Sequence, residues 1–189
     1  MIPVGATPMK TPVLSLRAPA PSLSLGMALF CGVAITAFAT RAETAPPIKI
    51  AVFDFELEDY SAGGGVIGET PEDVAQLKRA TDEARQLLAQ SGRYSLVDVS
   101  PADAEPAKTQ SLRMCGGCEA DIAHRLGADQ SFVGVVARSS RTEYAVGFQI
   151  RDARDGSLVF KQQTDLRMGT NDSWNRGVIR LIKNTLLNN

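Results

Sequence analysis

Two cysteines separated by two glycines are the residues of this sequence best suited to chemistry. Cys115 and Cys118 enclose Gly116 and Gly117, and the glycines allow the short ring of a Cys-x-x-Cys disulfide to close without hindrance from side chains. Cys118 stands at or just before a helix predicted from Glu119, and a helix N-terminus stabilises a thiolate and lowers the pKa of a thiol. The pair predicts either a structural disulfide or a site of thiol–disulfide exchange.

Other uses of the cysteine pair fit the sequence less well. Zinc needs four ligands in a structural site, and His124 is the only histidine of the chain. Covalent haem needs a histidine directly after the second cysteine, where this chain has Glu119. A thioredoxin-like site directly follows a strand and faces a cis-proline, whereas here a polar segment comes before the pair and no proline follows Pro106. The structural disulfide and the exchange site both remain open.

Four carboxylates crowd the end of the first predicted strand: Asp54, Glu56, Glu58 and Asp59. Alternation along a strand places Asp54, Glu56 and Glu58 on one side. Such a cluster suits a hard cation such as calcium, and the alternative is a solvated strand end beside a flexible loop. Paired carboxylates could also serve acid–base catalysis, but nothing else in the sequence marks a substrate pocket. No cofactor is predicted.

The first 39 residues have the pattern of a secretory signal peptide. An uncharged apolar run, residues 23–39, follows Lys10 and Arg17 with no acidic residue before it, and Ala37–Ala39 forms an A-x-A cleavage site. The alternatives are an uncleaved membrane anchor and a lipoprotein processed at Cys31, which lacks the small residue needed before it. Cleavage near Ala39 predicts a periplasmic protein that touches the membrane only through an uncleaved leader, if at all.

Removal of this leader leaves a chain suited to one domain in an oxidising compartment. We expect a polar linker at 40–47 and a single domain at 48–189. The leader carries two of the 20 basic residues and none of the 21 acidic ones, so the mature chain is slightly acidic, and nucleic acid is excluded as a partner. Only Cys115 and Cys118 remain, an even pair that favours a disulfide in the periplasm.

Apolar spacing and turn residues predict an α/β (α+β) fold with a single mixed sheet of about five strands, in the order β-α-β-α-β-β-β-α. Thr70 and Pro71 begin the first helix, and Asp155-Gly156 joins two strands as a hairpin. The predicted elements are strands at 48–57, 94–99, 131–137, 142–151 and 158–167, and helices from Pro71 to Gly92, from Glu119 to Leu126, and from Asn171 or Asp172 onward.

The segment HRLGADQSFVGVV at 124–136 resembles the N-terminal domain of the Tol-system protein TolB, the curli secretion protein CsgG and the penicillin-binding-protein activator lipoproteins. In those families a helix that ends in Leu-Gly-Ala-Asp leads into a strand containing a glycine, as residues 126–129 and Gly134 do here. The resemblance implies a TolB-like fold. It implies no chemistry.

A second resemblance covers nearly the whole mature chain. The segments KIAVFDFEL, CGGCEADIAHRLGAD and TNDSWNRG are similar to a family of secreted proteobacterial proteins, a domain of unknown function. That resemblance implies genes that often neighbour those of methanol or other quinoprotein alcohol dehydrogenases. It implies no catalytic residues.

Together these features predict a non-enzymatic accessory protein of the periplasm that binds another periplasmic or envelope protein, within a quinoprotein alcohol-oxidation system. One alternative is a thiol–disulfide exchange protein that acts through Cys115 and Cys118. Another is a carrier of calcium or a lanthanide that uses the carboxylates from Asp54 to Asp59.

Overall fold

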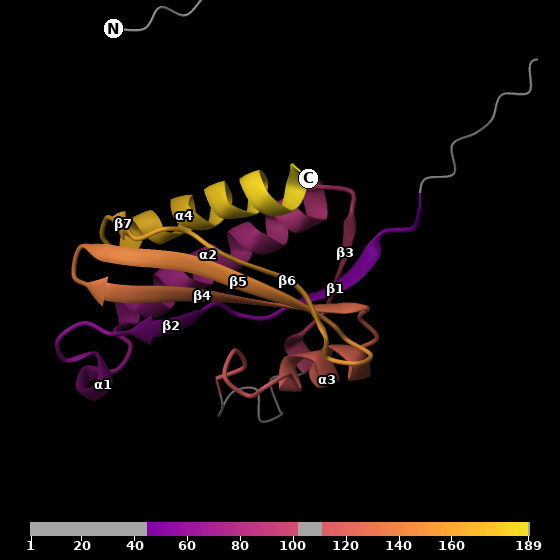
Figure 1. The fold of residues 1–189 in the computed structure, drawn as a ribbon, viewed down its shortest axis with the longest axis horizontal. Helices are drawn as coiled ribbons and strands as arrows, with labels where there is room; N and C mark the ends of the chain where they lie inside the picture. The colour runs from indigo at the N-terminus through magenta and orange to yellow at the C-terminus, as the bar shows by residue number, and fades with distance from the viewer. Residues whose placement is uncertain (1–44, 102–110, 189) are drawn as a thin grey trace, which may run out of the picture. The chain divides into compact units, whose positions relative to one another are not determined.

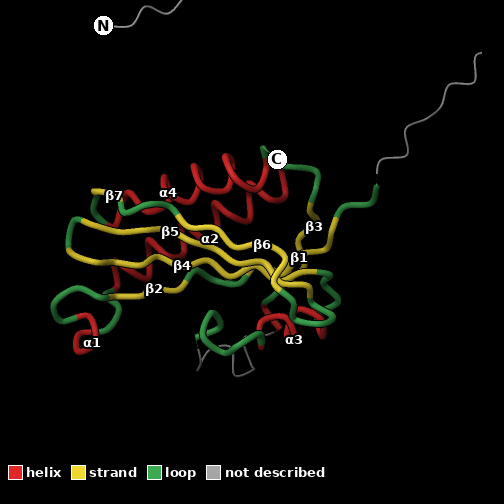
Figure 2. The backbone as a smooth tube through the Cα atoms, in the orientation of Figure 1, coloured by secondary structure: helices red, strands yellow, loops and turns green. Residues whose placement is uncertain are grey.

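The computed structural model describes residues 45–101 and 111–188. The predicted signal peptide, residues 1–39, and most of the predicted linker lie outside the described residues. Figures 1 and 2 show a sheet with helices α2 and α4 on one face and α3 on the other. The predicted fold class, helices packed around a single mixed sheet, is therefore confirmed.

The sheet has the strand order β3-β1-β4-β5-β6. β1, β3 and β4 are parallel neighbours, and β5 and β6 extend the sheet in the antiparallel sense. Two short strands complete it, β2 beside β4 and β7 beside β5. The bounds are β1 Ile48–Val52, β2 Glu56–Asp59, β3 Tyr94–Val97, β4 Gln130–Ser140, β5 Glu143–Asp152, β6 Leu158–Gln163 and β7 Arg167–Met168.

The predicted strand 48–57 was wrong in its continuity, because it forms two strands, β1 and β2. Both strands pair with β4. Val52 at the end of β1 lies opposite Phe132, and Glu56 at the start of β2 lies opposite Val135, so four steps from β1 to β2 match only three steps along β4. The additional residue makes a bulge. Asp54 projects outward there with its side chain 80% exposed. The predicted strand 158–167 is divided in the same way into β6 and β7.

Phe55, inside this bulge, packs on Gly134 of β4. A Cβ atom at Gly134 would lie 2.3 Å from Cζ of the phenylalanine ring, so only glycine fits without a shift of the core. The backbone N–H of Phe55 donates to Thr81 Oγ1 of α2 at 2.9 Å. The strand glycine therefore serves packing, and the bulge is held to the helix above it.

Helix α2 (Pro71–Gln90) begins as predicted. Thr70 Oγ1 accepts the backbone N–H of Asp73, and the Asp73 carboxylate accepts the backbone N–H of Thr70, which is a capping box. Val74, an apolar residue of the first turn, is 53% exposed. The inward-facing position in this turn belongs to Asp73, which is fully buried.

Helix α4 (Trp174–Leu181) starts later than predicted. Asn171 and Asp172, the expected caps, lie in a 3₁₀ turn at Asn171–Ser173, and the helix continues as a π-helical stretch at Ile182–Leu187. Trp174 is 1% exposed and belongs to the core between α2, α4 and the sheet. Within the described ranges, no helix is both long and apolar enough to cross a membrane.

The opposite face of the sheet is covered by α3 (Cys118–Arg125), one residue ahead of its predicted start. A smaller core lies beneath it, built from Ala51, Phe53, Leu112, Ile122, Ala123, Ala128, Val133 and Ala153. β1 serves both faces by alternation, since Ile50 and Val52 point to the other core. The cysteine pair is therefore placed at the edge of this second, smaller core.

Candidate functional site

The cysteine pair opens helix α3. Cys115 and Cys118 form a disulfide, with an S–S distance of 2.02 Å and a Cα–Cα distance of 5.7 Å. Gly116 and Gly117 between them have φ angles of 76° and 120°, a backbone region that other L-residues rarely adopt. Cys118 is the first helical residue, and its backbone N–H donates to Cys115 Sγ at 3.1 Å. One sulfur therefore receives an N–H group from the helix N-terminus.

Glu119, the next residue, is a buried carboxylate that the sequence did not single out as a site residue. It is 0% exposed. Its Oε1 atom accepts hydrogen bonds from Gln149 Nε2 at 2.8 Å and from Arg151 Nε at 2.9 Å, both from β5. Its Oε2 atom lies 3.4 Å from Cys115 Sγ. An acidic residue in a first helical turn normally suggests a solvated partner of the helix dipole, so the sequence offered no signal of this burial.

The four predicted carboxylates face three different arginines. Asp54 pairs with Arg85 at 3.2 Å. Glu56 and Glu58 pair with Arg113 at 3.3 and 2.8 Å. Asp59 pairs with Arg138. Metal binding by Asp54, Glu56, Glu58 and Asp59 stays a prediction.

Within the described residues, the group of sulfur and carboxylate ligands whose atoms lie within 4.8 Å of one another is Cys115, Cys118 and Glu119. Its two sulfurs are bonded to each other here, so the trio is a disulfide beside a carboxylate. Glu56 also holds the segment before the pair, since its carboxylate accepts from Ser111 Oγ and from the backbone N–H of Leu112. The disulfide is thus tied to β2.

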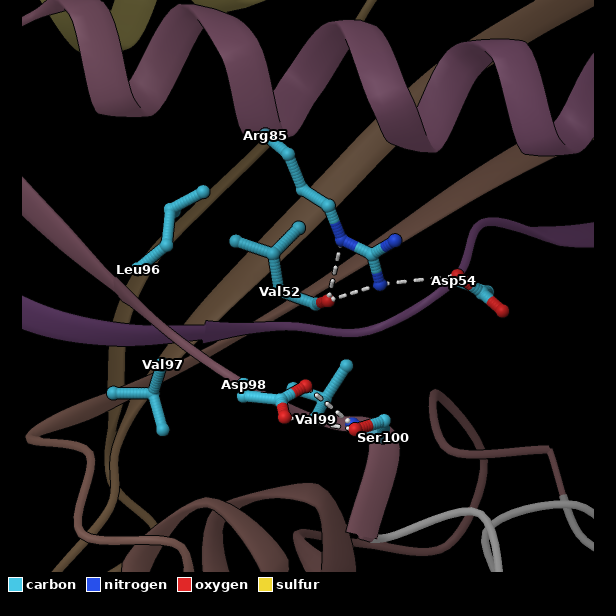
Figure 3. A pocket seen from close by; sticks show the side chains of 8 residues that line it. All are labelled: Val52, Asp54, Arg85, Leu96, Val97, Asp98, Val99 and Ser100. Carbon is cyan, nitrogen blue, oxygen red and sulfur yellow. Dashed lines mark hydrogen bonds and ion pairs between the residues drawn. The ribbon is translucent and has the colours of Figure 1, made fainter.

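A crevice of about 380 Å³ lies at the carboxyl ends of β1 and β3. Arg85 of α2 spans it (Figure 3), donating through Nε and Nη2 to the carbonyl oxygen of Val52, at 3.3 and 2.8 Å. Across the crevice, hydrogen bonds from the Ser100 backbone and hydroxyl lower the pKa of Asp98, and Arg85 adds to the effect. Arg85 therefore caps the carbonyl oxygen at the end of β1, and this structural role explains its position in the crevice.

At the far end of β4, Arg138 joins two carboxylates. Its Nη1 lies 2.7 Å from Oδ1 of the buried Asp73, and its Nη2 lies 2.5 Å from Oδ2 of Asp59. The Arg138 hydrogen bond lowers the pKa of Asp59 from 3.8 to about 2 against the opposing effect of burial. Burial would raise the pKa of Asp73, but donors from Thr70 and Arg138 outweigh it and lower the value. Asn171 Nδ2 also donates to Asp73. The network joins β2, α2, β4 and the turn before α4.

A loop of exposed apolar residues begins at this network. Tyr60, Val66 and Ile67 are 67%, 91% and 73% exposed. The last two lie in the short helix α1 (Gly64–Ile67), which the sequence did not predict. Figure 1 shows α1 beyond the end of β2, away from the layers of sheet and helix. A depression of about 710 Å³ separates this loop from residues 138–142.

The comparisons with known proteins identify a family. The family model DUF3280, described as "Protein of unknown function (DUF2380)", matches residues 48–186. A search of curated proteins finds no match to the chain.

Several solved structures resemble the chain. The C-terminal domain of LpoB from Salmonella enterica has 16% identity and a TM-score of 0.47, over 65% of this chain and 84% of that one. Lipoprotein GNA1162 from Neisseria meningitidis has 16% identity and a TM-score of 0.44, over 74% and 99%. TolB from Acinetobacter baumannii has 16% identity and a TM-score of 0.37, over 75% and 29%. At these values the similarities transfer no function to this chain.

Proposed function

The chain belongs to this family of proteins of unknown function, and we propose from its own geometry that it is a non-enzymatic protein-binding module of the periplasm. The observation that carries the proposal is the exposed apolar loop of Tyr60, Val66 and Ile67. Large apolar side chains gathered on one projecting loop mark an interaction surface more often than single exposed residues do.

The base of this loop is well suited to presenting it. Asp59, directly before Tyr60, is tied to Arg138, and Asp59 Oδ1 accepts the backbone N–H of Ser61 at 2.9 Å. At the other end of the loop, Thr70 caps α2 through Asp73. Because both ends are held, a partner binds the loop without a large entropic cost of ordering its ends.

The proposed compartment and partner follow from the leader and the disulfide. A signal peptide cleaved near Ala39 would deliver residues 40–189 to the periplasm, where a disulfide between Cys115 and Cys118 is stable. The proposed partner is another periplasmic or envelope protein. The resemblance to the secreted family supports a component of a quinoprotein alcohol-oxidation system as that partner.

The test compares two matched double variants of the full chain. Val66→Asp with Ile67→Asp places charge on the loop, and Leu158→Asp with Val159→Asp places the same charge on β6, where both side chains are about half exposed. Mild crosslinking in the periplasm, followed by mass spectrometry, identifies the partner. The dissociation constant of that purified partner is then measured for each variant.

We expect the loop variant to bind at least about tenfold more weakly, since each buried aliphatic side chain contributes about 1.5 to 3 kcal/mol, and the β6 variant to bind as the wild type does. Recovery of no partner, or equal binding by both variants, would contradict the proposal. A partner outside alcohol oxidation would overturn only the quinoprotein assignment.

A further inference from the structure

We propose that the Cys115–Cys118 disulfide exchanges with the thiols of a client protein, and that the Glu119 carboxylate takes part by accepting the hydrogen bond of the Cys115 thiol in the reduced form. This activity goes beyond protein binding through the apolar loop. It rests on three features of the α3 N-terminus: the unequal surroundings of the two Glu119 oxygens, the N–H group on Cys115 Sγ, and open space around the two glycines.

The two oxygens of Glu119 have different surroundings. Both donors from β5, Gln149 and Arg151, bind Oε1. Oε2 instead faces Cys115 Sγ at 3.4 Å, and a sulfur in a disulfide carries no proton to donate. Reduction gives Cys115 an S–H group with two acceptors in reach, the buried Glu119 Oε2 and the carbonyl oxygen of Leu112, which lies 3.0 Å from Sγ. The charged carboxylate is the stronger acceptor of the two. A hydrogen bond to a charged group favours the state that forms it by about tenfold or more, so the dithiol is stabilised relative to the disulfide.

The helix N-terminus assists Cys115 as the leaving group. The Cys118 backbone N–H donates to Cys115 Sγ at 3.1 Å, and an N–H group at a helix N-terminus stabilises negative charge on sulfur. Cys118 packs against the core under α3. The N–H group offsets the repulsion between a departing Cys115 thiolate and Glu119 Oε2 until the sulfur is protonated, and Cys118, only partly buried, remains open to attack.

A client can approach the bond from the side of the glycines. A Cβ atom added at Gly116 or at Gly117 would meet no atom within 4 Å. Met114, next to the pair, is 71% exposed and offers a flexible apolar contact for a client chain. Bulk at the glycines would block this approach.

The exchange is written for a client dithiol. A client thiolate attacks Cys118 Sγ, a client–Cys118 disulfide forms, and the Cys115–Cys118 bond breaks with its electron pair on Cys115. Cys115 takes a proton from water and donates its S–H to Glu119 Oε2. The second client thiolate then attacks the client sulfur of the mixed disulfide and releases Cys118, which is protonated from water. Two electrons pass from the client to the pair, the two client protons go to water, and two protons from water replace them on the cysteines.

The test measures the thiol–disulfide equilibrium of the full mature chain in glutathione buffers of varied ratio, with the reduced fraction counted by alkylation. Glu119→Gln keeps an oxygen for Gln149 and Arg151 but turns an amide toward Cys115. Asp121→Asn, an exposed acidic residue in the same helical turn, is the matched control for loss of charge.

We expect the wild-type bond to be reduced by glutathione. We expect Glu119→Gln to shift the equilibrium about tenfold toward the disulfide, which corresponds to about 30 mV, and Asp121→Asn to leave it unchanged. A wild-type bond that resists excess reduced glutathione would overturn the exchange activity even if the Glu119 variant fails to fold. An equal shift in both variants, or no shift in either, would overturn the role of Glu119.

Discussion

Two buried carboxylates, Asp73 and Glu119, make an informative comparison. Both are 0% exposed, both lie in the first turn of a helix, and each pairs with an arginine from the sheet, Arg138 for Asp73 and Arg151 for Glu119. Asp73 accepts N–H groups on both oxygens. Glu119 accepts them on one, and its second oxygen meets a sulfur.

The difference separates a structural charge from one available for chemistry. Both oxygens of Asp73 are already hydrogen-bonded, so oxidation or reduction of a neighbouring group would give this carboxylate no new donor. Asp73 therefore serves to join the elements around it. Glu119 can gain a donor when the disulfide is reduced. Burial and ion pairing alone do not distinguish these roles, whereas the partners of each oxygen do.

The largest effect on stability is expected from removing Arg138, the arginine that pairs with Asp73. Arg138→Ala leaves Asp73 charged and buried without its ion pair, and such a loss costs about 3 to 5 kcal/mol of unfolding free energy. Urea unfolding measures it. Lys78→Ala, which breaks the exposed pair with Asp82, is the control and should cost less than about 1 kcal/mol. Similar losses in the two variants would show that the Asp73 network is not what stabilises this end of the sheet.

A smaller effect is expected from acid at the same site. The pKa of Asp59 is about 2 in the folded chain against 3.8 for the free residue. The folded value is the lower one, so the contribution to stability is full above 3.8 and disappears as the pH falls from 3.8 to about 2. The loss is about 2 kcal/mol.

Urea midpoints between pH 5 and pH 2 measure this loss. Asp59→Asn should lack this part of the pH dependence while it keeps that of the other carboxylates. If the wild type and Asp59→Asn follow the same curve, the Arg138 pair does not set the pKa of Asp59.

The Glu119 site should respond more weakly in stability. Gln149→Leu removes one of the two donors to Oε1 and leaves Arg151, so the unfolding free energy should fall by about 1 kcal/mol. Gln162→Leu, an exposed amide on β6, is the control and should have no effect on unfolding. A loss above the one seen for Arg138→Ala would reverse the ranking of the two sites.

The smallest effect is expected from calcium. Each carboxylate from Asp54 to Asp59 already faces an arginine, so calcium should leave the thermal midpoint unchanged within error. Calorimetry with calcium and with a lanthanide checks the same point. A heat of binding that Asp54→Asn and Glu58→Gln abolish would establish the metal-carrier alternative instead.

Local signals predicted much of the fold. Thr70 and Pro71 mark the start of α2 because a cap and a proline act on adjacent backbone groups. Asp155-Gly156 predicted the turn between β5 and β6, where Gly156 has a φ of 69°. The positions of the strand breaks were not predictable in this way, since the bulge at Asp54 depends on the register against β4.

The sequence by itself determined the main strands and helices and that a Cys-x-x-Cys pair opens a helix, because caps, turn residues and apolar spacing act within a few residues. The tertiary structure alone decided what faces the pair. Glu119 meets Gln149 and Arg151, which are 30 and 32 residues away along the chain, only after β5 has paired with β4 and α3 has packed on the sheet. The surroundings of a charged group depend on such distant packing, and local sequence does not encode them.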